Sequence, residues 1–255
     1  MKKSVWAVAA VSVLAVVPSL ASAQGKSDWS LSGNMSLVSD YRFRSISQTY
    51  RLPAIQGGFD LGHNAGFYVG TWASNVSGNQ YLGGNGMELD IYGGYKFDVA
   101  KGVTLDLGFI YYLYPGAKVS LTKDYNTTEI YGGVTIGNLS AKVNYGVSDF
   151  FGAPDSSGSF YVDTNYIWPL SKTSNLVFHV GYQSIKNGDA LFNGVDPNYT
   201  DYKVGFTTEA AGLVWGVAYI GNTAKDVPYT VQHAVDGAPK IVAKDTVVLS
   251  VGKTF

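Results

Sequence analysis

Along most of this chain, apolar side chains alternate with charged or polar ones at a period of two residues. In the segment 87–97, Leu89 and Ile91 have one parity, whereas Glu88 and Asp90 have the other. Successive side chains of a β-strand point to opposite faces, so the alternation predicts strands with one apolar and one polar face. No long segment has the periodicity of a helix. The mature chain is therefore predicted to be all-β.

About twelve runs share this pattern, and most reach the roughly 9–11 residues that a tilted strand needs to cross a bilayer. They occupy residues 29–44, 53–62, 66–74, 87–97, 103–114, 128–136, 139–148, 159–168, 175–185, 201–209, 212–220 and 246–255. Within them the apolar parity carries a single charge, Lys253, whereas many charges lie on the other parity: Asp40, Arg42, Arg44, Asp60, Glu88, Asp90, Lys96, Asp106, Glu129, Lys142, Asp163, Lys203 and Glu209. A charge on a lipid face costs about 2–4 kcal/mol at the bilayer centre, so a charge-free parity is typical of a surface that faces lipid.

The connections between the runs alternate between long and short. Outer-membrane barrels have short periplasmic turns and longer outer loops, so we expect a closed antiparallel transmembrane β-barrel of about 12 strands with both termini on the periplasmic side. The short connections are His63–Ala65, Asp98–Gly102, Gly137–Asn138, Pro169–Ser174 and Ala210–Ala211. A soluble β-sandwich also alternates, but it needs neither the loop pattern nor a charge-free parity on every strand.

Aromatic residues lie where the two rims of such a barrel are expected. Those predicted near the periplasmic rim are Trp29, Phe59, Phe67, Phe97 and Trp168, and those near the outer rim are Tyr41, Phe43, Tyr111 and Tyr145. The chain ends on Phe255 after an alternating strand, and a terminal aromatic of this kind resembles the assembly signal of outer-membrane barrels. Lys253 departs from that signal. The expected partners are therefore the barrel-assembly machinery and outer-membrane lipids.

The first residues have the organisation of a secretory signal peptide. Lys2 and Lys3 precede the apolar run Trp6–Val17, and Ala21-Ser22-Ala23 follows as a small-x-small cleavage site. A retained anchor is the alternative, but the run is shorter than the roughly 20 residues of a membrane-spanning helix. We predict a cleaved signal peptide at residues 1–23 and a barrel at 24–255, exported through the periplasm to the bacterial outer membrane.

The composition excludes several function classes. The formal net charge is −1 without a basic cluster, which argues against nucleic acid as a partner, and the absence of cysteine excludes disulfides and thiolate metal sites. The chain contains neither Gly-x-Ser-x-Gly nor His-Glu-x-x-His. None of the three histidines is predicted on the membrane face, where a lipase-type serine-histidine pair would lie. We expect no enzyme, no cofactor and no metal site.

The polar parity supplies the candidate functional residues. The candidates for lining a pore are Asp40, Arg42, Arg44, Glu88, Asp90, Asp106, Glu129 and Lys142. Opposed charges inside a barrel can select ions, but in a narrow barrel they can equally pair off and fill it. The favoured function is a porin-like channel of low conductance for ions or small solutes. The alternative is a non-conducting barrel that presents surface loops for binding or adhesion.

Several stretches of the first half of the chain resemble the TorF-like porins, catalogued also as Gcw_chp, proteobacterial proteins of unknown function. They are Ser39–Gln48, Pro53–Gly58, Gly66–Asn75, Glu88–Tyr95, Tyr111–Ala117 and Glu129–Tyr131. Ser45 stands where the family commonly has Gly, which bears on a bend at that position. The resemblance implies an outer-membrane porin and brings no substrate or catalytic residue.

The last outer connection, Asn222–Asp245, is about twice as long as the others and has strand character of its own. Tyr229–Val235 and Lys240–Ala243 flank Asp236-Gly237-Ala238-Pro239, in the order strand, turn, strand. We expect strands eleven and twelve to continue beyond the membrane as a hairpin. Either it stands upright and presents His233 outside, or it folds inward and narrows the pore.

Overall fold

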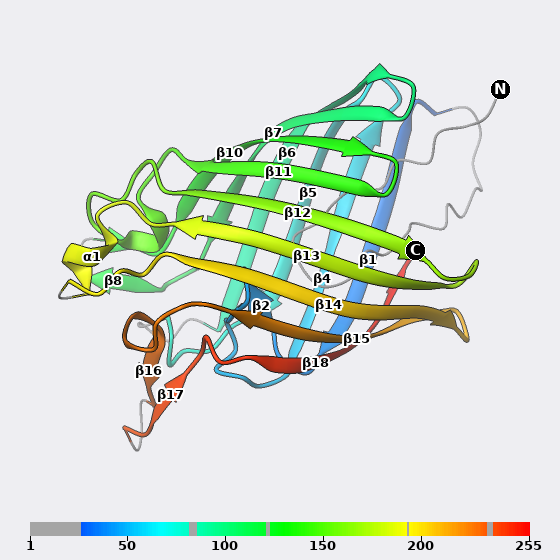
Figure 1. Cartoon of the computed structure of the whole chain (residues 1–255). Coiled ribbons are helices and arrows are strands. Elements are labelled where there is room, and N and C mark those ends of the chain that lie inside the picture. Colours follow the sequence, from blue (N-terminus) through cyan, green and yellow to red (C-terminus); the bar gives the residue numbers. More distant parts are fainter. Residues whose placement is uncertain (1–26, 82–85, 121–122, 193, 234–236) are drawn as a thin grey trace.

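The computed structural model describes residues 27–81, 86–120, 123–192, 194–233 and 237–255. Within them, twelve antiparallel strands form one closed barrel, which confirms the predicted fold class (Figure 1). In chain order its strands are β1 (Trp29–Val38), β4 (Ala54–His63), β5 (Phe67–Asn75), β6 (Met87–Ala100), β7 (Val103–Leu113), β10 (Thr127–Ile136), β11 (Leu139–Gly146), β12 (Phe160–Pro169), β13 (Ser174–Ser184), β14 (Tyr199–Ala210), β15 (Leu213–Asn222) and β18 (Thr246–Thr254). The predicted signal peptide lies outside the described residues.

The barrel closes where β1 meets the end of the chain. β1 pairs with β4 along one edge and with β18 along the other, where Asn34 is opposite Thr254. Gly33 and Phe255 exchange two backbone hydrogen bonds of 2.8 and 2.9 Å, which extends this seam to the last residue. The ring of Phe255 lies against Gly33, and a Cβ there would come within 2.6 Å of the ring. Gly33 therefore allows the terminal aromatic to pack on the outside of the seam.

The two faces of the barrel wall follow the alternation of the sequence. The large apolar residues of the strands are exposed on the outward parity, as Leu31, Ile55 and Leu107 illustrate. The inward parity of the same strands carries buried polar groups, among them Glu88 and Glu129. None of the helices in the described part of the chain has the length and apolar character to cross a membrane.

The connections alternate in length as predicted. At one end of the barrel, short turns join the strands at residues 64–66, 101–102, 137–138, 170–173 and 211–212. The longer connections gather at the other end, which we call the outer end (Figure 1). Their described residues contain three two-stranded ribbons, β2 (Arg42–Phe43) with β3 (Ile46–Ser47), β8 (Lys118–Ser120) with β9 (Lys123–Asp124), and β16 (Thr230–Gln232) with β17 (Pro239–Ile241). They also contain the one-turn helices η1 (Phe150–Gly152), α1 (Gly188–Leu191) and η2 (Val227–Tyr229).

The expected hairpin in the last connection is present, but its form differs from the prediction. β16 and β17 pair with each other, with Thr230 opposite Ile241. The prediction that strands eleven and twelve continue into it is wrong, because β15 ends at Asn222 and η2 lies between β15 and β16. Residues 234–236 of the predicted strand and turn lie outside the described residues.

Candidate functional site

The largest departure from the sequence prediction is the first outer connection, residues 39–53, which we call the inner loop. The predicted first strand, 29–44, is too long, because β1 ends at Val38 and the chain then folds into the barrel. Every residue from Asp40 to Tyr50 is buried. A segment buried along its whole length inside a barrel fills the lumen at its level. Tyr41 and Phe43, expected on the outer aromatic rim, are 0% and 7% exposed and lie inside instead.

A tight turn gives the inner loop its shape. The two-residue strands β2 and β3 are joined by Arg44 and Ser45, whose φ angles of 46° and 66° are left-handed. Positive φ at both central residues is the pattern of a type I′ hairpin turn, which suits the twist of the two strands. Such a conformation favours glycine, which agrees with the residue that the resembling family commonly has at Ser45. The bend is thus retained although the glycine is not.

Arg44, at the tip of this turn, joins the inner loop to the opposite wall. Its Nη2 lies 2.6 Å from Oε2 of Glu129 on β10, and its Nη1 donates to Oε1 of Gln183 on β13 at 2.7 Å. Its guanidinium also lies 4.4 Å from the centre of the Tyr161 ring. Burial disfavours the charged form of Arg44, yet the Glu129 carboxylate outweighs burial and raises the pKa of the guanidinium above its ordinary value. Arg44 is therefore a charged anchor of the loop.

Two neighbouring side chains of the inner loop also contact inward carboxylates. Ser45 Oγ donates to Oδ2 of Asp201 on β14 at 3.0 Å, and the Tyr41 hydroxyl donates to Oε1 of Glu88 on β6 at 3.1 Å. Asp201 lies in turn 3.0 Å from Nε2 of His179. Ser45 bonds the carboxylate and not the imidazole, so these three residues are not arranged as a nucleophile with its base.

Arg42 connects the inner loop to the last outer connection. Its Nε donates to Oδ2 of Asp40 at 2.7 Å, and its Nη1 donates to the carbonyls of Val242 and Lys244 at 3.1 and 2.9 Å. Nearby, the hydroxyl of Tyr50 donates to the carbonyl of Ala238 at 2.9 Å, so the β16–β17 hairpin also contacts the inner loop. The two outer connections hold each other in place.

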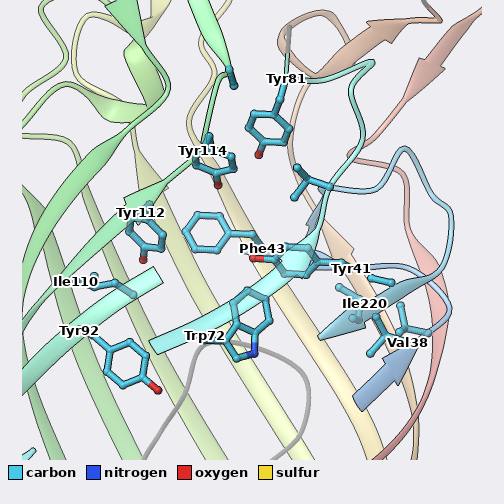
Figure 2. Close-up of a cluster of buried hydrophobic side chains, with 14 of the residues drawn as sticks. Val38, Tyr41, Phe43, Trp72, Tyr81, Tyr92, Ile110, Tyr112, Tyr114 and Ile220 are labelled. Atoms are coloured by element: carbon cyan, nitrogen blue, oxygen red, sulfur yellow. The ribbon is translucent and has the colours of Figure 1, made fainter. Parts of the chain in front are cut away.

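The apolar side chains of the inner loop complete the filling of the lumen. Figure 2 shows Tyr41 and Phe43 among inward aromatic rings of the barrel wall. The ring centres of Tyr41 and Trp72 are 5.3 Å apart, and those of Phe43 and Tyr112 are 5.4 Å apart, both in edge-to-face geometry. Aromatic pairs of this kind stabilise a cluster beyond their buried area, by about 0.5–1.5 kcal/mol each. The inner loop is therefore packed into the barrel by rings as well as by charges.

A second polar layer lies closer to the short turns. The Tyr68 hydroxyl donates to Asp106 at 2.6 Å, and Lys96 lies 3.8 Å from the same carboxylate. Lys142 lies 4.7 Å from the centre of the Tyr131 ring. Most of these side chains are partly exposed, unlike those at the inner loop. The lumen is thus filled at its outer level, and the side chains of the second layer are less deeply buried.

The predicted pore-lining residues therefore divide between two layers. Asp40, Arg42 and Arg44 lie on the inner loop, and Glu88, Asp90 and Glu129 lie on the wall beside it, whereas Asp106 and Lys142 belong to the second layer. Asp201, Gln183 and Tyr161 also contact the inner loop and were not among the candidates. Their inward parity was a signal that could have identified them. Whether any of these residues lines a conducting path stays a prediction.

No metal centre is evident in the parts of the chain that the structure describes, since no group of three or more His, Asp or Glu side chains there could hold an ion.

The barrel, its two faces and the inner loop define a class of protein: a small closed barrel with an apolar exterior, a charged interior and its own first loop folded inside. The chain belongs to the family Gcw_chp, described as a bacterial protein of unknown function, whose model matches residues 22–255. The resemblance to Gcw_chp is confirmed. The description of this family does not include the name TorF-like. No curated protein matches the chain.

Solved structures of porins are similar to this chain in fold. The KdgM porin has a TM-score of 0.53 and 8% identity over 88% of this chain and 98% of its own. The NanC porin has a TM-score of 0.52 and 9% identity over the same shares, 88% and 98%. At such low identities the likeness shows the fold alone.

Proposed function

We propose that this protein is an outer-membrane channel for passive passage of ions or small solutes, and that the inner loop narrows it. The observation that carries the proposal is the charged interior. Charged groups cost free energy to bury, so a barrel that served only as a scaffold would be better filled by apolar residues. The fold that the chain shares with porins supports the proposal.

On this proposal the chain resides in the bacterial outer membrane after export through the periplasm. Lipids surround its outward face, and the barrel-assembly machinery recognises the strand that ends in Phe255. Its cargo is ions or small solutes, and it needs no cofactor and no nucleic acid. The protein is not an enzyme on this proposal, in keeping with the arrangement of Ser45, Asp201 and His179.

The charges at the level of the inner loop favour cations. Buried carboxylates there outnumber guanidiniums: Asp40, Glu88, Asp90, Glu129 and Asp201 stand against Arg42 and Arg44. Rings of carboxylates select cations because they lower the energy of a positive ion in the constriction. We therefore expect small currents. In a salt gradient, their reversal potential should be displaced toward the equilibrium potential of the cation.

A non-conducting barrel that presents its outer loops for binding is the second candidate, and the burial of the inner loop favours it. Planar-bilayer recording of the purified protein separates the two. A channel gives discrete cation-selective steps, and replacing Arg42 and Arg44 together with Ser should enlarge them and strengthen the cation preference. If no current passes through either protein, the channel proposal is wrong. If the reversal potential is unchanged, the two arginines do not line the path.

A further inference from the structure

A continuous chain of hydrogen-bond contacts runs from the barrel wall to the tip of the inner loop. Asn165 on β12 donates through Nδ2 to Oδ1 of Asp163 at 2.6 Å, and its Oδ1 lies 2.8 Å from Nδ1 of His179. On the other side of the imidazole ring, Nε2 lies 3.0 Å from Oδ2 of Asp201, the oxygen to which Ser45 of the inner loop donates. His179 is therefore the central member of a chain that ends on the inner loop.

The orientation of the Asn165 amide determines the role of Nδ1 of His179. If the amide were turned to point its nitrogen at the ring, its oxygen would lie 2.6 Å from the Asp163 carboxylate with no hydrogen between the two acceptors. The amide oxygen therefore faces the ring. Because an amide oxygen only accepts, Nδ1 carries a hydrogen and donates it to Asn165.

The contacts of Nε2 require a second hydrogen. The Tyr161 hydroxyl lies 3.0 Å from Nε2 and also 3.0 Å from Oδ1 of Asp201, but it has only one hydrogen to donate. If Tyr161 donated to Nε2, both contacts of the Asp201 carboxylate with Tyr161 and His179 would lack a hydrogen. A proton between Nε2 and Oδ2 completes all of these contacts, since Tyr161 can then donate to Oδ1. A neutral histidine has one N–H, so the geometry calls for one additional proton, wherever it lies between the two atoms.

The charged surroundings of this proton come from both neighbouring strands and from the inner loop. The titratable and charged groups around His179 are Asp163, Tyr161, Asp201, Lys203 and Arg44. Arg44 is paired with Glu129. Lys203 is opposite His179 in the pairing of β13 with β14, yet in the described part of the chain the one ion pair of Asp201 is that with His179. Asp201 is 1% exposed, so the protonated imidazole supplies the counter-charge that this buried carboxylate needs.

We propose that His179 and Asp201 bind one proton that stabilises the inner loop in its buried position. Ser45 covers the oxygen that faces Nε2, so the pair is buried only while the loop is in place. Without the proton, Asp201 is a buried carboxylate that lacks its counter-charge, and release of the loop hydrates it. The buried form of the loop therefore binds the proton more tightly than the released form.

The sign of the pH dependence follows from this difference. A proton that binds the buried form more tightly favours that form at low pH, and the preference is lost as the pH rises. Histidine changes its charge between about pH 5 and 8, so the loop should be released more often toward the upper end of that range. As a regulation of the proposed channel, the inference rests on that function.

The test measures exposure of the inner loop without current. The chain has no cysteine, so Ile46→Cys places a single thiol at a buried position of the loop, and Val227→Cys places one at an exposed position. Each is labelled in detergent with a charged methanethiosulfonate at about pH 5.5 and about pH 8. The rate for Ile46→Cys is divided by the rate for Val227→Cys, which removes the pH dependence of the thiol. This ratio should rise on the order of tenfold between the two pH values.

The substitution His179→Gln should abolish the rise, because glutamine does not titrate. A matched control removes the other two histidines in His63→Gln/His233→Gln, which should keep the full rise. This control is sharp because the ring of His233 lies 5.8 Å from that of Tyr50 on the inner loop and is the closest rival. Nitrogen NMR of the unsubstituted protein is a second measurement, and the His179 ring should carry hydrogen on both nitrogens at about pH 5.5.

Four results would refute the proton site: a constant ratio in the His179 background, a rise that survives His179→Gln, a rise that is lost in His63→Gln/His233→Gln, or a His179 ring with one hydrogen at both pH values. Each of them would leave the channel untouched. A pH-dependent ratio in a protein that passes no current would keep the proton site and refute the channel.

Discussion

Replacing Arg44 with methionine should detach the inner loop from the opposite wall. The substitution removes the pair with Glu129 and the hydrogen bond to Gln183, both in a fully buried setting. Glu129 would retain the hydroxyl of Tyr112 at 3.2 Å but would lose its counter-charge. Breaking a buried pair by removing one partner costs about 3–5 kcal/mol, and we expect a loss of this size in the free energy of unfolding.

A second substitution should compensate for the first. Glu129→Gln in the Arg44→Met background removes the carboxylate that has lost its counter-charge. The double variant should therefore recover at least half of the lost free energy of unfolding, with a coupling free energy between positions 44 and 129 on the order of 2–3 kcal/mol. The assay is urea unfolding of the barrel in lipid vesicles, followed by tryptophan fluorescence. Lys118→Met, which breaks an exposed pair with Asp124, is the control and should cost less than about 1 kcal/mol. A cost for Arg44→Met as small as that of the control would refute the role of Arg44 as an anchor.

Three further outcomes follow from the same structure. A cysteine at the outward Ile91 should report lipid, whereas one at Glu88 should stay closed to aqueous thiol reagents until the inner loop is released; immediate labelling would contradict its burial. Deleting residues 229–242 removes the hairpin that contacts the inner loop, so openings in bilayer recordings should become more frequent, and unchanged openings would mean that the hairpin does not hold the loop. The hydrogen bond from Lys123 lowers the pKa of Asp149 below 3.8; the stability that this pair gives the outer end is therefore complete above the ordinary pKa and lost as the pH falls through the lower, folded value. Proteolysis of residues 147–159 should accelerate over that range in the parent, and a Lys123→Met variant that shows the same pH dependence would contradict the assignment.

The barrel strands could be predicted from the sequence because an outward face proposed to meet lipid follows a strict rule. A charge on the lipid face is costly, so the parity of Leu89 and Ile91 against Glu88 and Asp90 identified the two faces of β6 correctly. The alternating loop lengths identified the ends of the barrel in the same way. Both signals arise from local geometry and a uniform environment.

The inner loop could not be predicted because its sequence imitates a strand. Asp40, Arg42 and Arg44 alternate with Tyr41 and Phe43, and the alternation continues past the end of β1. The aromatic residues of that alternation pack against rings in the lumen rather than against lipid, which depends on long-range contacts that no local pattern encodes. The turn was hidden as well, because neither of its central residues is glycine or asparagine.

The inner loop narrows a channel that the barrel would otherwise form at full width. Val38 and Ala54 are direct partners in the β1–β4 pair, so a two-residue Asn-Gly turn can replace residues 39–53 without disturbing the barrel. Single-channel conductance of this variant and of the parent, in the same bilayer and salt, is the most direct measurement. We expect small or infrequent steps for the parent and large, steady, cation-selective steps for the variant. Equal conductance in the two proteins would contradict it.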